Sequence, residues 1–356
     1  MIFRFPVYLL LILFLSACSG PGYYVQAISG HWKLMHARQD IPSLMDNPET
    51  GPGLSQQLKT ADEIKSFAED KLDLPANGNY SSYVEVGGSA VVWNVVATGE
   101  FSLLAKKWCF PVAGCVPYRG FFKKEKAESS ATRLRKKNMD VHVSPATAYS
   151  SLGWFKDPLL STMLGGSDIR LAAYLFHELA HLRLYIKDDT DFNEGYASFV
   201  EQAGVRAWLD SRRQQDRLVQ YQQLQNAKQD FTSLIRKVRG ELTWLYQSTD
   251  SEIEKREKKA GILKEFKHSH EQLISKKWNG KRYYSAWLES PVNNARLALY
   301  NAYAGSQCAF LELFKQAKGN MSKFHQLAEQ KSRLEKAERE KWLTQTCTNV
   351  NSVNSI

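Results

Sequence analysis

The sequence predicts an α+β fold in which helices predominate. Valine, tyrosine, tryptophan and phenylalanine, punctuated by glycine, are frequent in residues 80–122 and predict several short strands and hairpins. Residues 168–209 read as two helices, and apolar residues between 221 and 245 recur at alternating spacings of three and four, which is typical of a long amphipathic helix. We therefore expect a small β-sheet upstream of a mainly helical remainder.

The chain begins with a short apolar segment. Residues 1–18 read MIFRFPVYLLLILFLSAC, with an apolar run at 5–15 that is shorter than the about 20 residues of a membrane span and typical of a signal peptide. The last four residues, LSAC, resemble the lipobox of bacterial lipoproteins. That resemblance implies that residues 1–17 are removed, that Cys18 is lipidated, and that Ser19 directs the protein to the outer membrane, facing the periplasm. An ordinary signal peptide with a chance cysteine is the alternative.

Composition narrows the classes of protein. With 43% apolar and 24% charged residues in 356, the chain is globular rather than disordered, collagen-like or built of many membrane spans. The net charge of +10 favours acidic surfaces. The basic stretch 123–137 lacks interleaved aromatic residues, so we expect no nucleic acid partner. Residues 18–356 are expected to form one domain with a helical hairpin at about 208–290.

Four cysteines remain after the signal peptide, and the compartment permits disulfides. Four cysteines allow three connectivities. The turn-forming FPVAG between Cys109 and Cys115 favours pairing of these two, which leaves Cys308 with Cys347. A zinc site made by these cysteines is the alternative, but the sequence has no CxxC pair.

Several further helices are predicted around these segments. Residues 24–73 are expected to form two helical pieces, and residues 293–318 and 321–343 one helix each. The apolar seam of the long helix has one gap, at Lys228. The seam comprises Tyr221, Leu224, Phe231, Ile235, Val238, Leu242 and Leu245.

One segment has the spacing of a metal site. Residues 177–181 read HELAH, within a helix whose apolar stripe lies on another face. Two imidazoles four residues apart, from His177 and His181, can close on one zinc ion, and Glu178 then points toward the coordination position that a water would take. The spacing predicts a zinc site with an adjacent general base.

The next segment supplies the missing ligand. Two histidines leave zinc short of a protein ligand, and residues 193–201 read NEGYASFVE. Glu194 would complete a set of two histidines and one glutamate with an open position for water, which is typical of catalytic rather than structural zinc.

HELAH followed by NEGYASFVE resembles the gluzincin metallopeptidases, most closely the zinc aminopeptidases in which NEGFAS-like residues follow HELAH. The resemblance implies a zincin-like (gluzincin) core, zinc held by His177, His181 and Glu194, and Glu178 as the general base. The connection at 182–193 is shorter than in those enzymes, and a GAMEN-type motif is missing. Together with LSAC, WCFPVAGCVPYRGFF and SSLGWF, the motifs resemble a family of bacterial lipoproteins described as aminopeptidases, over most of the mature chain.

The sequence also offers candidate residues for the other roles in a peptidase site. Glu201 lies on the same helix face as Glu194 and is a candidate to orient a zinc histidine, or an exposed carboxylate. By analogy with related enzymes, Tyr303, or else Tyr300, is a candidate oxyanion donor, and 149–154 a substrate-binding edge strand. Glu100 is a candidate to hold a free amine.

The sequence thus predicts a lipid-anchored zinc peptidase, acting on peptides or proteins as an aminopeptidase. The alternatives are a zinc endopeptidase acting on envelope proteins or peptidoglycan peptides, and a non-catalytic envelope lipoprotein that uses its long helical hairpin as a scaffold.

Overall fold

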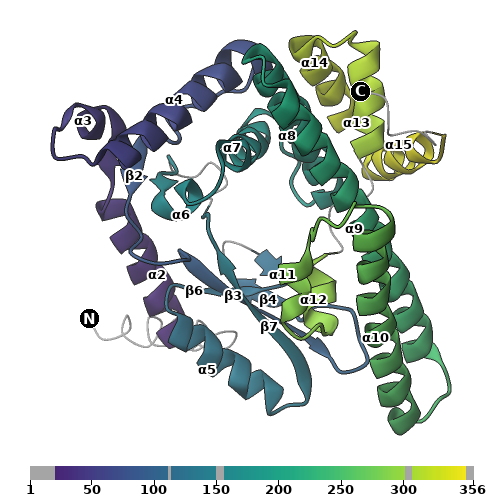
Figure 1. Ribbon diagram of the computed structural model, residues 1–356. Helices are drawn as coiled ribbons and strands as arrows, with labels where there is room; N and C mark the ends of the chain where they lie inside the picture. The colour runs from purple at the N-terminus through teal and green to yellow at the C-terminus, as the bar shows by residue number, and fades with distance from the viewer. Residues whose placement is uncertain (1–20, 111–113, 150–155, 301–306, 350–356) are drawn as a thin grey trace, which may run out of the picture.

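The computed structural model describes residues 21–110, 114–149, 156–300 and 307–349. Helices predominate and the sheets are small, which confirms the predicted α+β class (Figure 1). Within these ranges, no helix combines the length and the apolar character that crossing a membrane would require. The helices are α2 (Pro21–His36), α3 (Ile41–Asp46), α4 (Pro52–Leu72), α5 (Lys124–Arg135), α6 (Ser161–Leu164), α7 (Asp168–Arg183), α8 (Thr190–Ser211), α9 (Gln215–Gln247), α10 (Glu252–Lys276), α11 (Ser285–Glu289), α12 (Asn294–Leu299), α13 (Gln307–Gln316), α14 (Met321–Ser332) and α15 (Lys336–Asn349).

The strands form three small sheets in the described part of the chain. Their orders are β1-β2-β8, β6-β3-β7 and β4-β5. β7 pairs antiparallel with β3 over eight residue pairs and lies at the edge of its sheet. The strands are β1 (Gln39–Asp40), β2 (Ser82–Val84), β3 (Val92–Gly99), β4 (Trp108–Phe110), β5 (Gly114–Val116), β6 (Arg119–Phe121), β7 (Met139–Ala146) and β8 (Leu159–Leu160).

Two helices hold the β6-β3-β7 sheet. Alternate β3 residues, Val95 and Ala97, pack with Ala127 and Ala131 of α5 in one apolar cluster, as the period of a strand requires. α12 docks through polar contacts instead. The Asn294 side chain donates a hydrogen bond of 2.8 Å to the Glu100 carbonyl, just beyond the end of β3. The sheet is thereby tied to α12, which follows the long helices α9 and α10 in the chain.

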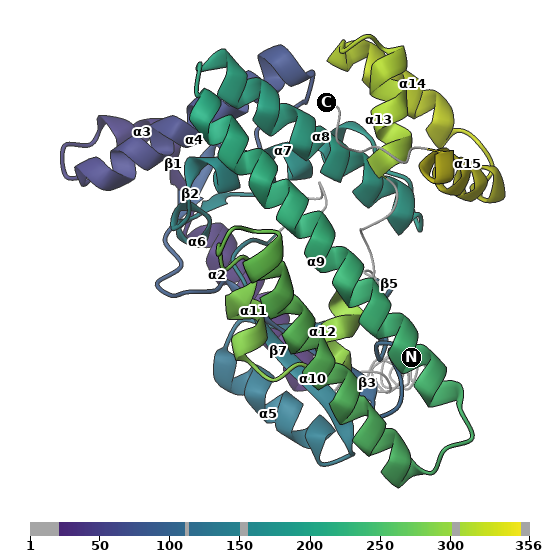
Figure 2. The ribbon, with the colours of Figure 1, turned by 45° about the vertical axis from the view of Figure 1, so that its right-hand side comes forward.

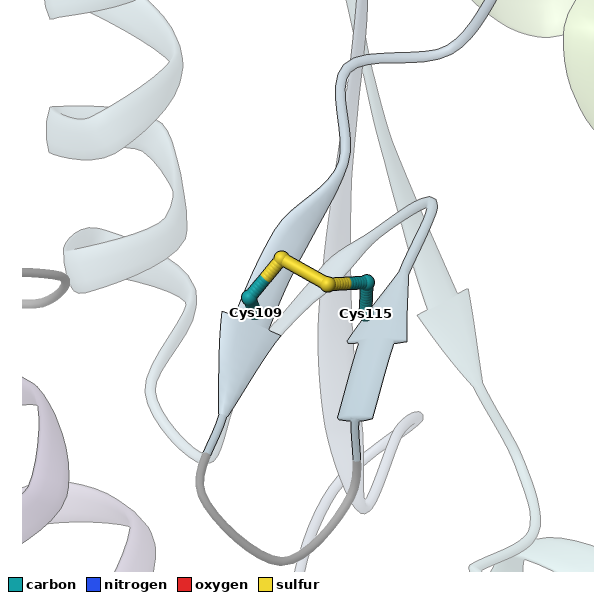
Figure 3. Close-up of a disulfide and its surroundings, with 2 residues drawn as sticks. All are labelled: Cys109 and Cys115. Atoms are coloured by element: carbon teal, nitrogen blue, oxygen red, sulfur yellow. A yellow bond between two sulfur atoms is a disulfide. The ribbon is translucent and has the colours of Figure 1, made fainter.

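The predicted disulfide between Cys109 and Cys115 is present (Figure 3). It joins β4 to β5, where the two cysteines are directly opposite each other in the antiparallel pair. Their Cα atoms are 3.9 Å apart. Cys308 is also disulfide-bonded, but the Cys347 side chain lies outside the described residues, so the pairing of these two stays a prediction.

The largest apolar core joins α4, α7, α8, α13 and α14. α7 and α8 lie side by side in Figures 1 and 2. They approach closely because position 204 is glycine: a Cβ there would lie 2.7 Å from Leu72 Cδ1 and 2.8 Å from Phe176 Cδ2. Any larger residue at Gly204 would push the two helices apart.

A second core lies between α9 and α10, which run side by side in Figures 1 and 2. These helices span residues 215–276, a shorter stretch than the expected 208–290, because α8 continues to Ser211 and α11 is separate. The seam prediction was wrong at Leu224, which is 41% exposed. Tyr221 packs in the core around α8, whereas Phe231 packs against α10, so the apolar face of α9 changes partners between them.

Other predicted boundaries also need correction. Residues 24–73 form three helices rather than two, because β1 separates α2 from α3. The expected single helix at 321–343 is broken into α14 and α15. The Arg339 guanidinium stabilises this break, since it donates hydrogen bonds to the carbonyls of Ser332 and Leu334 between the two helices.

Candidate metal centre

The HELAH motif lies in α7. Ser167 begins the helix by accepting a hydrogen bond from the Arg170 amide, and Asp168 in the first turn suits the positive end of the helix dipole. Leu175 and Leu179 on the apolar stripe are fully buried. This packing fixes the rotation of α7, so that the two histidines of the motif project from a different face.

The connection between α7 and α8 is held by a buried asparagine. The Asn193 side chain accepts a hydrogen bond of 2.8 Å from the Ile186 amide and donates one of 2.7 Å to the Ile186 carbonyl. The two hydrogen bonds join the two ends of the connection between α7 and α8 and so hold it as a tight loop. The next residue, Glu194, is consequently placed opposite α7.

The N-terminus of α8 is fixed by a buried ion pair. The Asp189 carboxylate caps the helix by accepting a hydrogen bond from the Phe192 amide and accepts another of 2.8 Å from Arg339 of α15. The side chains are 5% and 9% exposed, respectively. The C-terminal helices therefore help to position the helix that carries Glu194.

Three side chains converge between α7 and α8. His177 Nε2 lies 3.2 Å from Glu194 Oε2, and His181 Nε2 lies 3.5 Å from Glu194 Oε1. One ligand atom from each of the three residues falls within 4.8 Å of the other two. The structure thus brings together the three residues that the sequence predicts as metal ligands.

Glu201, one of the sequence candidates, supports the first histidine. Its Oε2 atom lies 3.2 Å from His177 Nδ1, on the side of the ring opposite Glu194. Metal-bound histidines commonly donate their second ring nitrogen to such an acceptor. In contrast, Nδ1 of His181 is buried and forms no hydrogen bond with the described residues. The two histidines are therefore held differently.

The ion pairs shift the protonation equilibria of this cluster. Burial alone lowers the pKa of His177, but the hydrogen bonds to Glu194 and Glu201 outweigh it and raise the pKa to about 10. Burial raises the pKa of Glu194, whereas its hydrogen bonds with His177 and His181 lower it to about 2. Metal-free His177 is consequently an imidazolium at neutral pH, and Glu194 is a carboxylate.

These residues fit a bound divalent ion. Two imidazole Nε2 atoms and one carboxylate form a donor set that catalytic zinc sites use. The carboxylate of Glu201 keeps the Nδ1 proton on His177, so that an ion would displace the proton of Nε2 and bind at that nitrogen, beside Glu194.

Glu178 lies on α7 among tyrosines that the sequence did not single out. Burial, together with the neighbouring Glu178, raises the pKa of both Tyr80 and Tyr174 well above the usual value. Tyr174 precedes Glu178 by one helical turn and therefore shares its face. The four-residue spacing from Glu178 could therefore have pointed to Tyr174 in the sequence. Tyr80 comes from a distant segment, and no sequence pattern links it to Glu178.

A cavity of about 520 Å³ lies beside the triad, lined mainly by α8 and α9, with the end of α12 and the start of α13. His177, Glu194 and Glu201 form part of its wall. Tyr300, the second tyrosine candidate, also lines it, and burial raises its pKa. Tyr303, the first candidate, lies outside the described residues.

Other predicted residues lie elsewhere. Glu100 does not line the cavity, and its carboxylate accepts hydrogen bonds of 2.7 and 3.0 Å from Arg256 of α10; that it holds a substrate amine stays a prediction. Cys18 and nearly all of the expected edge strand at 149–154 lie outside the described residues. Tyr149, the described end of that segment, has its hydroxyl 3.2 Å from His31 Nδ1.

Neither a curated protein nor a solved structure matches the chain. A protein family described as "Putative aminopeptidase" matches residues 22–343. The match extends from α2 to the C-terminal helices and includes the residues of the metal centre, and it agrees with the aminopeptidase family inferred from HELAH and NEGYASF. The chain therefore belongs to this family of peptidases.

Proposed function

We propose that this protein is a zinc-dependent aminopeptidase. One observation carries the proposal: His177, His181 and Glu194 converge while Glu201 holds the far nitrogen of His177. Ligand atoms from two helices are gathered around one point, and Glu178 of the same motif lies on α7 beside them. Membership of a peptidase family supplies the class of reaction.

The residues have distinct roles in this proposal. His177, His181 and Glu194 hold the zinc ion, which when bound polarises a peptide carbonyl and lowers the pKa of water. Glu178 accepts the proton of the attacking water and returns it to the leaving amine. Tyr303 stays our candidate for donating a hydrogen bond to the oxyanion.

The proposal includes attachment to a membrane. A signal peptide of residues 1–17, followed by a lipid on Cys18, would anchor the enzyme in the bacterial outer membrane on the periplasmic side. The family match begins at residue 22, just after the proposed anchor. Peptides of the envelope would then be the substrates within reach.

The test combines metal analysis with paired substrates. The full chain should contain about one zinc ion and should hydrolyse an aminoacyl p-nitroanilide but not its N-acetylated form, because an aminopeptidase requires the free amine. Glu178→Gln should keep the ion and lose activity by roughly 10²- to 10⁴-fold, the usual contribution of general acid–base catalysis.

Glu257→Gln is the matched control, since Glu257 is exposed on α10 and distant in sequence from the cluster. Full activity of Glu178→Gln would refute its role as the base. Equal hydrolysis of acetylated peptides would identify an endopeptidase, and a chain without hydrolysis of any peptide would leave the alternative of a scaffold lipoprotein.

A further inference from the structure

The cavity beside the metal centre has two polar walls. On α8, Glu194, Ser198 and Glu201 recur at helical spacing and face it. On α9, Gln225 and Lys228 occupy the facing positions. The volume of about 520 Å³ falls within the range of small-ligand sites, about 300–1,000 Å³. The cavity is thus large enough for part of a peptide.

Two buried polar side chains line this cavity without partners. Ser198 and Gln225 are each only 6% exposed. Neither side chain hydrogen-bonds to another described residue, and neither has a fully buried polar atom left without a partner, so the Ser198 hydroxyl and the Gln225 amide are open to the cavity. A hydroxyl and an amide that border a cavity in this way are suited to bind a polar ligand.

The cavity also has a half-buried lysine. Lys228 pairs with no carboxylate within the described part of the chain. Other α9 residues do form ion pairs: Lys237 lies 3.8 Å from Glu241, and Asp230 lies 2.5 Å from Lys277. Lys228 therefore differs from its neighbours in keeping its charge available to a ligand.

The charges of the cavity favour an anion once a divalent ion is bound. Its carboxylates, Glu194 and Glu201, both contact His177 at 3.2 Å and belong to the metal centre. A divalent ion balances these two negative charges, which leaves Lys228 as a cation on the α9 wall that no carboxylate of the described residues pairs with. Such a wall would repel the free amine of a peptide and attract a carboxylate.

We infer that this cavity binds a carboxylate of the substrate on the C-terminal side of the cleaved bond, with Lys228 as the charged ligand and Gln225 as a hydrogen-bond donor. The inference rests on the proposed peptidase function. The substrates it selects are short peptides with a free C-terminus close to the cleaved bond, or peptides with an acidic side chain there. The C-terminus and the acidic side chain both supply a carboxylate to the cavity.

Four tripeptides separate these sources: Ala-Ala-Ala, its C-terminal amide, and the amides of Ala-Glu-Ala and Ala-Gln-Ala. The zinc-loaded full chain should prefer at least one carboxylate peptide over its neutral counterpart in kcat/KM. Lys228→Gln should reduce that preference roughly tenfold, as expected for loss of a charged hydrogen-bond partner. The pair that shows the effect identifies the source of the carboxylate.

Lys237→Gln is the matched control on the same helix, because Lys237 pairs with Glu241 and does not line the cavity. It should leave the preference unchanged. Absence of any preference in the unmodified chain, or a preference that Lys228→Gln does not reduce, would overturn the inference while leaving the peptidase proposal intact.

Binding provides a readout that does not depend on turnover. The same peptide pairs can be titrated by calorimetry into zinc-loaded Glu178→Gln, with and without Lys228→Gln. The ratio of the Kd values for neutral and carboxylate peptides should fall roughly tenfold in the double variant. An unchanged ratio would overturn the inference even if no peptide were hydrolysed, and loss of hydrolysis alone would count only against the proposed function.

Discussion

The two helices that line the cavity beside the metal centre differ in how they are held. α8 is packed into the largest core, with Phe192, Tyr196 and Val200 fully buried around the residues that face the cavity. α9 buries its apolar seam mainly against α10 and presents a polar stripe to the cavity. A well-packed helix therefore carries Glu194, one of the three proposed metal ligands, whereas a more exposed helix carries the groups proposed to contact the substrate.

This difference indicates where each wall tolerates change. His325 Nε2 donates a hydrogen bond of 2.8 Å to the Leu72 carbonyl, and its Nδ1 accepts one of 2.6 Å from the Tyr196 hydroxyl. Such buried networks fix α8 against neighbouring helices. Along the cavity-facing stripe of α9, Gln229 and Ser233 are exposed. Substitutions on α8 should affect metal binding and stability, and substitutions on α9 should affect selectivity.

The largest expected effect is loss of the metal from the α8 wall. Glu194→Ala removes the carboxylate that faces both histidines, so the purified, desalted protein should retain no stoichiometric zinc. Removing a residue that only hydrogen-bonds to a metal ligand lowers metal affinity about 10- to 100-fold, and removing Glu194 itself should lower zinc affinity by more than that. Lys228→Gln on the α9 wall should keep its zinc. Equal metal content in both variants, measured by mass spectrometry, would contradict the division between the walls.

The next effect concerns the buried pair that fixes the start of α8. Arg339→Leu leaves the Asp189 carboxylate buried without its cation, so the free energy of unfolding of the metal-free protein should fall by about 3–5 kcal/mol. The control is Arg333→Leu, whose exposed pair with Glu329 should contribute at most about 1 kcal/mol. Denaturant titration checks both, and similar losses in the two variants would show that Arg339 does not anchor α8.

The convergence of the three proposed metal ligands could be predicted because metal chemistry constrains residue types and spacing. Two histidines one helical turn apart can share an ion only if α7 is a helix, and a third ligand had to follow. The means by which α8 is positioned could not be predicted. They depend on Gly204, Asn193 and Arg339, whose partners come from other segments and leave no local pattern.

The α9 wall shows a different limit of sequence reasoning. The seam at 221–245 correctly indicated a long amphipathic helix, and its gap at Lys228 was the visible sign of the second face. The pattern could not show that this face borders a cavity, because that depends on the packing of α9 against α8. For the same reason Leu224 was expected to be buried and is exposed. Periodicity predicts a face of a helix but not what covers it.

The smallest predicted effect is the pH dependence of metal binding to the α8 wall. The pKa of metal-free His177 is raised to about 10, so Nε2 carries a proton at neutral pH that an ion must displace. Raising the pH therefore favours the metal-bound state, and zinc affinity should increase about tenfold per pH unit up to a pH near that pKa. Glu194, with a pKa of about 2, is already ionised and contributes no proton.

Competition with a chelator between about pH 6.5 and about pH 8.5, corrected for protonation of the chelator, measures this slope. Glu201→Gln sharpens the test. It removes a carboxylate that raises the pKa of His177, so the steep region should end at a lower pH. Glu257→Gln should leave the profile unchanged. An affinity independent of pH, or a profile that Glu201→Gln does not shift, would show that the α8 carboxylates do not hold the proton on His177 before the metal arrives.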